Sequence, residues 1–566
     1  MARLGIALDL GTSGFRGQAV DLDQKGMILS TALSTRHPLP GANVMDHLHF
    51  AVEVGLEWAH EVVIHAVNQV VDNLGIEKDR VVRLAVCGNP IQLSLFQKIE
   101  IRDLAYAGEQ KLKALGVVPP KRDAQIIKAK DIRGLSLPAE TDILIPPSVR
   151  HEVGADALAL MIQSGMLEKD EIAIATDYGT NAEMALFYKG TVYTGSTAAG
   201  PALEGQQIED GLLALPGAIS DVMFEPGMGN FRGSKQTKML DQPIRRGLKV
   251  LVLDQEMLPR TGDTVDPVTG SLIKKGELAA VGITGTGVVA LISQGLQAKL
   301  IRLPRITTSD AMIHLPNGIK FTEKDLREAG KAIGSLRAGH ITLCQEAGIR
   351  LEDIETAYMS GASGTYVDAY KAQEIGMIPA RVKKVHQIGN TSLAMARDLV
   401  NDVDVLMHMT RIADDLRQHH SMFALSDVFK NVFILELAYW TEGMPLSLYQ
   451  QFLKKFNYPP LMDVNSPPQV IKRAEKDIPD LGVKGLKIIH DIGQRKTAVF
   501  EECSGCGACI RDCPENALHI EEEKMRFKIT INLALCDGVA CRRCERACNE
   551  KVFDLFKLMT SRHREE

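Results

Sequence analysis

The sequence has no long hydrophobic run. No apolar stretch of its 566 residues reaches the roughly 18 residues that a membrane-spanning helix requires. The apolar N-terminal residues are interrupted at once by Asp9 and Gly11, whereas a secretory signal peptide needs a longer apolar segment and a small-residue cleavage site. We therefore expect a cytoplasmic protein without a membrane span.

The sequence also lacks an excess of positive charge. Its 65 Lys and Arg residues against 71 Asp and Glu residues leave a formal net charge of −6, whereas a general nucleic-acid binder usually presents a basic surface. We therefore expect no nucleic-acid partner. Hydrophobic residues at 45% and charged residues at 24% are ordinary for a soluble globular protein.

Cysteine is scarce outside one segment near the C-terminus. Eight of the ten cysteines lie in it, and the other two, Cys87 and Cys344, are expected to be core residues. In a reducing compartment, clustered cysteines indicate metal binding or redox chemistry rather than disulfides. The spacing of the cluster is Cys503-x-x-Cys506-x-x-Cys509-x-x-x-Cys513-Pro514, followed by Cys536-x4-Cys541-x-x-Cys544-x-x-x-Cys548.

This spacing is the ligand pattern of a ferredoxin with two [4Fe–4S] clusters. In such a pair, three cysteines of one run and the last cysteine of the other run bind each cluster. We therefore expect one cluster on Cys503, Cys506, Cys509 and Cys548, and the other on Cys513, Cys536, Cys541 and Cys544.

The second cysteine run departs from the usual pattern. Four residues instead of two follow Cys536, and Asn549 stands where the first run has Pro514. We expect this difference to alter the loop and the potential of that cluster without removing a ligand. Two zinc sites are the alternative, because Cys-x-x-Cys also binds zinc. The third and fourth cysteines of each run favour iron–sulfur clusters.

A glycine-rich turn near the N-terminus is typical of a phosphate-binding loop. Residues 4–10 have a buried-strand pattern that ends in the turn Gly11-Thr12-Ser13-Gly14. Glycines let a backbone approach a phosphate closely, and exposed amides and hydroxyls can bind its oxygens. Asp9, at the end of the strand, could hold a water of a hydrated Mg²⁺. An ordinary glycine-rich hairpin is the alternative for this turn taken alone.

Residues 172–178 repeat the same design. This second buried strand ends in Asp177-Tyr178-Gly179-Thr180-Asn181, about 170 residues after the first loop. Two such hairpins predict a duplicated domain that binds the phosphates of a nucleotide between its halves. Each half would offer one carboxylate to a metal ion and one loop of amides to the phosphates.

A third turn follows a strand pattern at 354–360. Its residues are Gly361-Ala362-Ser363-Gly364, and a nucleoside could lie against the backbone of Gly361, Ala362 and Gly364. A plain turn from strand to helix is the alternative.

At about 150 residues per domain the length suggests roughly four units. We expect a first lobe at 1–170 with an insertion near 110–149, a second lobe at 171–400, a joining region at 401–496 and a ferredoxin-like domain at 497–566.

These motifs together resemble those of a known superfamily, which contains actin, sugar kinases and heat-shock chaperone ATPases. Four segments, 177–183, 200–205, 282–287 and 388–391, are more closely similar to the ATP-dependent reductive activators of corrinoid proteins. The pair of cubane clusters is similar to that of the methylamine methyltransferase branch of this family. Other branches carry an N-terminal plant-type [2Fe–2S] domain, whereas this sequence starts directly at the first phosphate strand.

The resemblance implies an α/β fold with duplicated actin-like (ribonuclease H-like) ATPase lobes and a small α+β ferredoxin domain. It implies ATP-dependent reduction of the inactive Co(II) form of a partner corrinoid protein to Co(I), which restores corrinoid-dependent methyl transfer of the kind used in methanogenesis. A low-potential donor would supply the electron. Asp9 and Asp177 would face Mg²⁺, and the phosphates of ATP would be held by Gly11, Thr12, Ser13, Gly179, Thr180 and Asn181.

Three other functions stay open from the sequence. An activator of a radical enzyme, like those of the 2-hydroxyacyl-CoA dehydratases, would hold one cluster between two subunits, which does not account for eight clustered cysteines. A ferredoxin-type electron carrier with a docking scaffold would not need two phosphate loops. A small-molecule kinase would not need the clusters.

Overall fold

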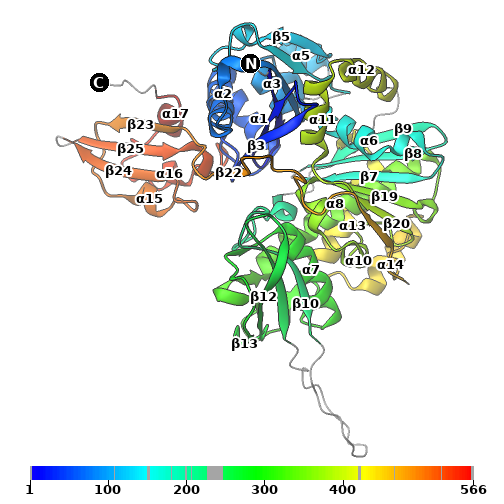
Figure 1. Cartoon of the computed structure of the whole chain (residues 1–566). Coiled ribbons are helices and arrows are strands. Elements are labelled where there is room, and N and C mark those ends of the chain that lie inside the picture. The colour runs from blue at the N-terminus through cyan, green and yellow to red at the C-terminus, as the bar shows by residue number, and fades with distance from the viewer. Residues whose placement is uncertain are drawn as a thin grey trace, which may run out of the picture. The chain divides into compact units, whose positions relative to one another are not determined.

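A computed structural model describes residues 3–106, 109–149, 153–179, 181–197, 201–205, 207–225, 247–417, 422–464, 466–523 and 526–561. The chain forms two compact units, each assembled from separate stretches (Figure 1). The first consists of Met1–Gln163, Thr391–His420 and Asp480–Glu566, and the second of Ser164–Asn390 and Ser421–Pro479. Among the described residues, no helix is long and apolar enough to cross a membrane.

The first unit is organised around a seven-stranded sheet of order β22-β3-β2-β1-β4-β6-β5. Its strand β1 (Leu4–Leu10) is buried throughout, as its apolar pattern predicts. β1 pairs antiparallel with β2 (Phe15–Asp21) and parallel with β4 (Val81–Gly88). The other strands are β3 (Met27–Ser34), β5 (Gln125–Lys128), β6 (Asp142–Ile145) and β22 (Leu486–Ile489).

The segment at 110–149, which the sequence predicts to be a peripheral insertion, contributes strands to this sheet. β6 pairs parallel with β4, and β5 pairs antiparallel with β6 at the edge. Both strands are only four residues long, too short to give a clear alternating pattern.

Helices pack directly on the strands of the first unit. α11 (Thr391–Asn401) packs on β1 and β4, so closely that a Cβ atom on Gly5 would lie 2.0 Å from the side chain of Val400. Glycine is therefore required at the point where helix and strand cross. The other helices are α1 (Val44–Glu53), α2 (Leu56–Asn73), α3 (Pro90–Gln97), α4 (Arg102–Ala105), α5 (Glu109–Ala114), α6 (Ala155–Ser164) and α12 (Asp404–Leu416).

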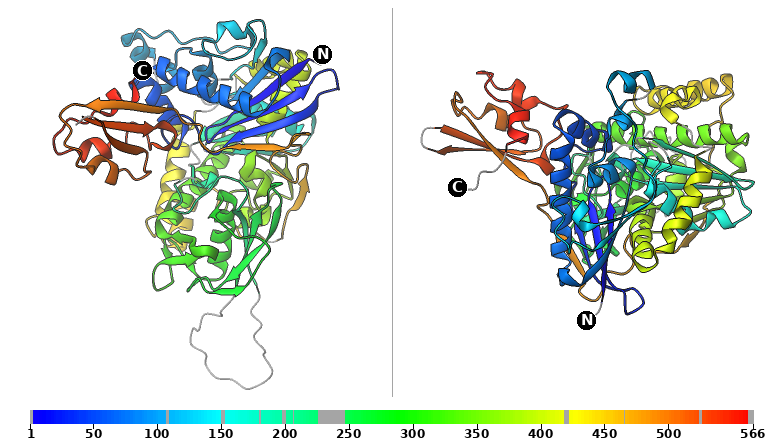
Figure 2. Two further views of the ribbon diagram at one scale, coloured as in Figure 1. Left: turned by 60° about the vertical axis from the view of Figure 1, so that its left-hand side comes forward. Right: turned by 90° about the horizontal axis from the view of Figure 1, so that it is seen from above.

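The C-terminal part of the first unit, after β22, has its own small antiparallel sheet of order β23-β25-β24. Figure 2 shows it as an orange to red sheet with short helices packed beside it. We call residues 495–559 the ferredoxin-like segment. Its elements are β23 (Arg495–Phe500), α15 (Ala508–Arg511), β24 (Leu518–Glu523), β25 (Arg526–Asn532), α16 (Arg543–Arg546) and α17 (Leu555–Met559).

The second unit contains a six-stranded sheet of order β21-β20-β19-β7-β8-β9. β7 (Ala173–Tyr178) pairs antiparallel with β8 (Ala182–Tyr188) and parallel with β19 (Thr356–Ser360). This repeats the arrangement around β1, since each of the two strands is followed by an antiparallel hairpin and flanked by a parallel strand on its other side. The remaining strands are β9 (Thr191–Thr197), β20 (Lys384–Gln387) and β21 (Gln469–Lys472).

A second, five-stranded sheet of order β13-β12-β11-β10-β14 completes the strands of the second unit together with two short hairpins. Its core is continuous with the buried side chains of α7 and α8. The strands are β10 (Ala218–Phe224), β11 (Leu248–Leu253), β12 (Pro259–Val265), β13 (Leu272–Lys274), β14 (Gly282–Ile283), β15 (Ile301–Arg302), β16 (Arg305–Ile306), β17 (Met312–His314) and β18 (Lys320–Thr322). The helices are α7 (Gly285–Gln297), α8 (Glu323–Ala347), α9 (Gly361–Tyr366), α10 (Ala369–Glu374), α13 (Asp427–Trp440) and α14 (Leu446–Lys455).

Candidate functional site

The first loop predicted to bind phosphate follows β1 directly. Asp9 is buried, with 4% of its surface exposed, and its Oδ2 accepts a hydrogen bond from Arg16 Nη1 of β2 at 3.2 Å. The turn is tight, because a Cβ atom on Gly11 would lie 2.9 Å from the Gly14 carbonyl oxygen. Asn89 Nδ2 donates to Thr12 Oγ1 at 3.1 Å. The buried strand β1 therefore places the Asp9 carboxylate and a compact loop at one end of the sheet.

A further carboxylate, Asp156, lies near Asp9. It is in the first turn of α6, where its Oδ1 accepts the amide of Ala157 at 2.8 Å. Burial, with the charge of Asp9 adding to it, raises the pKa of Asp156 to about 6. The sequence motifs did not identify this residue, because acidic side chains are common in the first turn of helices for reasons unrelated to a site.

The second loop predicted to bind phosphate has the same arrangement at the end of β7. Asp177 pairs with Glu183 across the β7–β8 hairpin, and the Gly179 amide donates to the Asn181 carbonyl at 3.2 Å. A Cβ atom on Gly179 would lie 4.0 Å from Glu204 Oε1. Thr180 lies outside the described residues.

The third predicted turn lies beside the second loop. β19 and β7 are parallel neighbours, with Ser360 opposite Asp177. A Cβ atom on Gly361, which has φ +78°, would lie 2.7 Å from Asp177 Oδ1. Ala362 and Gly364 belong to α9, which begins at this glycine. The structure therefore brings Gly361 and Asp177 together, although they are far apart in the sequence.

Four cysteines line one pocket of about 310 Å³ in the ferredoxin-like segment. They are the four predicted for the first cluster: Cys503, Cys506, Cys509 and Cys548. Apolar side chains of Phe500, Ile520, Ile529, Val552 and Phe553 complete most of the lining. Burial, followed by the charge of Cys503, raises the pKa of Cys509. Soft sulfur donors around an apolar space fit an iron–sulfur cluster.

The other four cysteines also lie close together. Burial raises the pKa values of Cys536 and Cys544 to about 12, with the neighbouring thiols adding to the effect. Cys513 and Cys541 act on both groups. The amide of Ala517 donates to Cys513 Sγ at 3.3 Å, the kind of contact that tunes cluster sulfurs. Within the described ranges, no three metal-ligating side chains are placed to hold a single ion.

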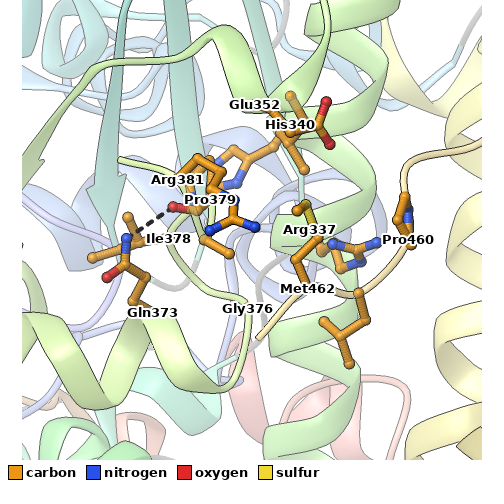
Figure 3. Close-up of a pocket in the computed structure, with 13 residues that line it drawn as sticks. Arg337, His340, Glu352, Gln373, Gly376, Ile378, Pro379, Arg381, Pro460 and Met462 are labelled. Carbon is orange, nitrogen blue, oxygen red and sulfur yellow. Dashed lines mark hydrogen bonds between the residues drawn. The ribbon is translucent and has the colours of Figure 1, made fainter. Parts of the chain in front are cut away.

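A separate pocket of about 410 Å³ lies in the second unit beside α8 (Figure 3). Arg337 on its wall is already paired, because its Nε donates to Glu436 Oε1 at 2.8 Å and its Nη2 to the Pro459 carbonyl at 2.7 Å. Burial, together with the charge of Arg337, lowers the pKa of His340 to about 3. The pocket includes none of the residues singled out in the sequence.

Two duplicated sheets with an aspartate loop after β1 and β7, together with eight grouped cysteines, define an actin-like ATPase joined to an iron–sulfur module. Comparison with known families agrees with this class. Residues 4–169 match the "RACo middle region", residues 171–450 match the "C-terminal domain of RACo the ASKHA domain", and residues 502–552 match a "4Fe-4S dicluster domain".

Individual relatives identify the family more closely. The chain is 47% identical over 519 residues, 92% of both chains, to a protein of Methanosarcina barkeri named "[Co(II) methylated amine-specific corrinoid protein] reductase". It is 26% identical over 401 residues to "Corrinoid activation enzyme RamQ" of Eubacterium limosum, covering 68% of this chain and 62% of that protein. The chain therefore belongs to the family of reductive activators of corrinoid proteins.

A solved structure supports the fold. The "Reductive activator for corrinoid,iron-sulfur protein" superposes with a TM-score of 0.61 at 22% sequence identity, over 80% of this chain and 68% of that one. The fold class predicted from the sequence motifs is thus confirmed, and the 47% identical relative confirms the predicted family.

Proposed function

We propose that this protein is an ATP-hydrolysing iron–sulfur reductase that returns the inactive Co(II) form of a corrinoid protein to Co(I). The observation that carries the proposal is the 47% identity, over 92% of the chain, to a protein named as a reductase of such a corrinoid protein. The two groups of four cysteines support the proposal, because iron–sulfur clusters bound there would carry electrons through the chain.

We assign the binding of Mg-ATP to the loops that follow β1 and β7. Asp9 and Asp177 orient the waters of Mg²⁺, since a hard cation prefers oxygen ligands and keeps much of its water. Backbone amides and hydroxyls of the loops bind the phosphates. The residues assigned to the phosphates are Gly11, Thr12, Ser13, Gly179, Thr180 and Asn181, and those assigned to the nucleoside are Gly361, Ala362 and Gly364.

Asp156 adds a third carboxylate to the first loop. Its raised pKa makes it a better proton acceptor than an ordinary aspartate near neutral pH. We assign it the task of orienting the attacking water or accepting its proton, while Asp9 stays with the metal. The carboxylates of Asp9 and Asp156 thus take different tasks.

The cysteine groups hold two [4Fe–4S] clusters, which supply single-electron transfer at low potential when bound. Thiolates of Cys503, Cys506, Cys509 and Cys548 bind the first cluster, and those of Cys513, Cys536, Cys541 and Cys544 the second. Apolar side chains such as Phe500 and Phe553 exclude water from the first. One electron from an external low-potential donor passes through the chain and reduces one Co(II) to Co(I), and hydrolysis of ATP to ADP and phosphate drives the step.

The test is ATP dependence of the reduction. The holoprotein, its Co(II) corrinoid partner and a low-potential chemical reductant are mixed without oxygen, with and without Mg-ATP, and Co(I) is followed by its absorbance. We expect Co(I) to accumulate only with ATP. Equal yields without ATP would exclude the coupling. Iron and sulfide analysis with EPR tests the clusters in parallel, and bound zinc in place of iron would exclude them.

A further inference from the structure

A chain of hydrogen bonds in the first unit links Thr12, which is partly exposed, to four buried polar residues: Asn89, Gln92, His37 and His47. Asn89 caps α3, where its Oδ1 accepts the Gln92 amide at 3.0 Å while its Nδ2 donates to Thr12. Gln92 lies between two histidines, with its Oε1 3.0 Å from His37 Nε2 and its Nε2 2.9 Å from His47 Nδ1. Gln92 and His47 are fully buried. The network therefore begins at the phosphate loop.

One backbone amide determines the direction of the two bonds between Gln92 and the histidines. The Leu39 amide donates to His37 Nδ1 at 3.1 Å, so the ring proton of His37 is on Nε2 and is donated to Gln92 Oε1. The amide nitrogen of Gln92 must then donate to His47 Nδ1, and both histidines are neutral. The two rings also stack at a centroid distance of 3.7 Å.

The histidines belong to the loop between β3 and α1 and to the start of α1 itself. We call residues 35–46 the histidine loop. It is tied to the phosphate loop a second time, because the Phe15 amide donates to Ser34 Oγ at 2.8 Å and Ser34 Oγ donates to the Arg36 carbonyl at 2.8 Å. Gly14 packs on the same point, where an added Cβ would lie 2.8 Å from the Ser34 carbonyl oxygen.

The far end of the histidine loop contacts the ferredoxin-like segment. The Gly41 amide donates to the carbonyl of Cys536 at 2.8 Å. Gly538 packs on the same glycine, since its Cβ would lie 3.5 Å from Gly41 Cα. Arg542 Nη2 lies 3.6 Å from Glu53 Oε2 at the end of α1. Gly538, a residue of the longer gap between Cys536 and Cys541, is thus among the residues that contact the nucleotide-binding lobe.

One position in the network is incomplete. His47 Nε2, which must carry a proton, is buried and makes no hydrogen bond of good geometry within the described part of the chain. Its ring lies close enough to the backbone of Gly41 for that residue to oppose the lowering of its pKa by burial. A buried donor with only this weak backbone contact is poorly satisfied, so a small shift of Gly41 toward His47 would stabilise the network.

We propose that this network couples occupation of the phosphate loop to the position of the segment that carries Cys536, with Asn89, Gln92, His37 and His47 as positioning residues. The inference rests on the nucleotide site proposed above. A phosphate that draws in Thr12 and Gly14 moves Asn89 and Ser34, and both are bonded to the histidine loop or to its network. Gly41 then moves the Cys536 carbonyl and with it the surroundings of the second cysteine group.

Hydrogen–deuterium exchange on the full-length, iron-loaded protein tests the coupling. Exchange is compared with and without Mg²⁺ and a non-hydrolysable ATP analogue. We expect the analogue to slow exchange by about threefold or more in three segments: residues 9–16, the histidine loop and residues 536–542. The EPR spectrum of the reduced second cluster should change as well.

Two variants isolate the network. Q92L removes both bonds to the histidines with a side chain of similar size, and S34A cuts the second tie if Q92L does not fold. Either should keep the response at residues 9–16 while the responses at 536–542 and in EPR fall by about half or more. H60Q is the matched control, since His60 is equally buried but bonds to Leu95 and Arg133 carbonyls. It should keep all responses.

The outcomes separate the two proposals. No response at residues 9–16 in the original protein would overturn the nucleotide site and this inference with it. A response there without one at 536–542 would overturn the coupling alone. A full response at 536–542 in both Q92L and S34A would exclude the network as its route, as would equal losses in H60Q.

Discussion

At the scale of single residues, the aspartates near the ends of β1 and β7 are expected to affect ATP hydrolysis, whereas the cysteines are expected to affect iron content. Replacing Asp177 by Ala removes a carboxylate from the second loop but leaves the ferredoxin-like segment intact. We expect ATP hydrolysis to fall by about 100-fold or more, as for loss of a charge-stabilising group in a transition state, with iron content unchanged. Phosphate release and iron analysis measure the two quantities. Loss of iron in D177A would show that the substitution disturbs more than the loop.

The pKa of Asp156 predicts a pH dependence of stability. Its pKa of about 6 in the folded chain lies above its unfolded value of about 4. Between these values the folded state binds more protons, so stability falls as pH rises. In the absence of magnesium and nucleotide, D156N should be more stable at neutral pH by about 1–2 kcal/mol, allowing for its partial exposure.

The advantage of D156N should disappear below about pH 4, where both side chains are uncharged. Urea unfolding at a neutral and an acidic pH measures the difference. A constant difference at both pH values would contradict the raised pKa. In the same variant, ATP hydrolysis should fall, because Asn cannot accept a proton from water.

At the scale of elements, the last cysteine of each run lies beside the first three cysteines of the other run. The pocket shared by Cys548 with the first three cysteines and the proximity of Cys513 to Cys536 predict that each single substitution affects the opposite run. C513S should therefore perturb the cluster held mainly by the second run, and C548S the one held mainly by the first. We expect each variant to lose about half of the iron.

EPR of the reduced variants distinguishes this crossed arrangement from a sequential one. C513S should retain the signal of the cluster bound by Cys503, Cys506, Cys509 and Cys548. If C513S and C509S removed the same signal, the arrangement would be sequential and the assignment would be wrong.

Elements differ in how well the sequence predicts them. The strands β1 and β7 and their loops are predictable because a buried strand, an aspartate and a glycine turn are adjacent in the chain. The cysteine groups are predictable because ligand spacing is local. Asp156 is not, since only folding brings it near Asp9. The network through Gln92 is not either, because a buried Gln and two His residues have no spacing that distinguishes them.

At the scale of the whole molecule, neither compact unit is one continuous stretch of the chain. The contiguous ranges expected from the sequence place 391–420 in the second lobe and the joining region, but this stretch belongs to the first unit, as does the chain from residue 480 onward. α11 packs on β1, and β22 extends the sheet beside β3. Local sequence patterns do not reveal that later segments such as α11 and β22 join the first unit, because the strands that they contact lie several hundred residues earlier in the chain.

This return predicts different effects for two truncations. A chain that ends after Ile492 keeps β22. A chain that ends after Pro479 loses β22 and also the Asp480 carbonyl, which accepts a hydrogen bond from Gln18 Nε2 at 2.7 Å. Thr31 Oγ1 likewise loses the Leu481 carbonyl. We expect the shorter chain to melt lower, on the order of 5 °C. Equal melting temperatures in circular dichroism would show that β22 does not stabilise the sheet.

The four-residue gap after Cys536 has a consequence for protein engineering. An ordinary two-cluster ferredoxin could be transplanted in place of residues 495–559, since the exchange point lies in the short connection after β22. Its two-residue gap would leave no counterpart to Gly538 against Gly41. Such a chimaera should accept electrons and hydrolyse ATP, but with the two activities running independently. Restoring the four-residue gap in the transplanted ferredoxin should then be the smallest change that couples ATP hydrolysis to electron transfer again.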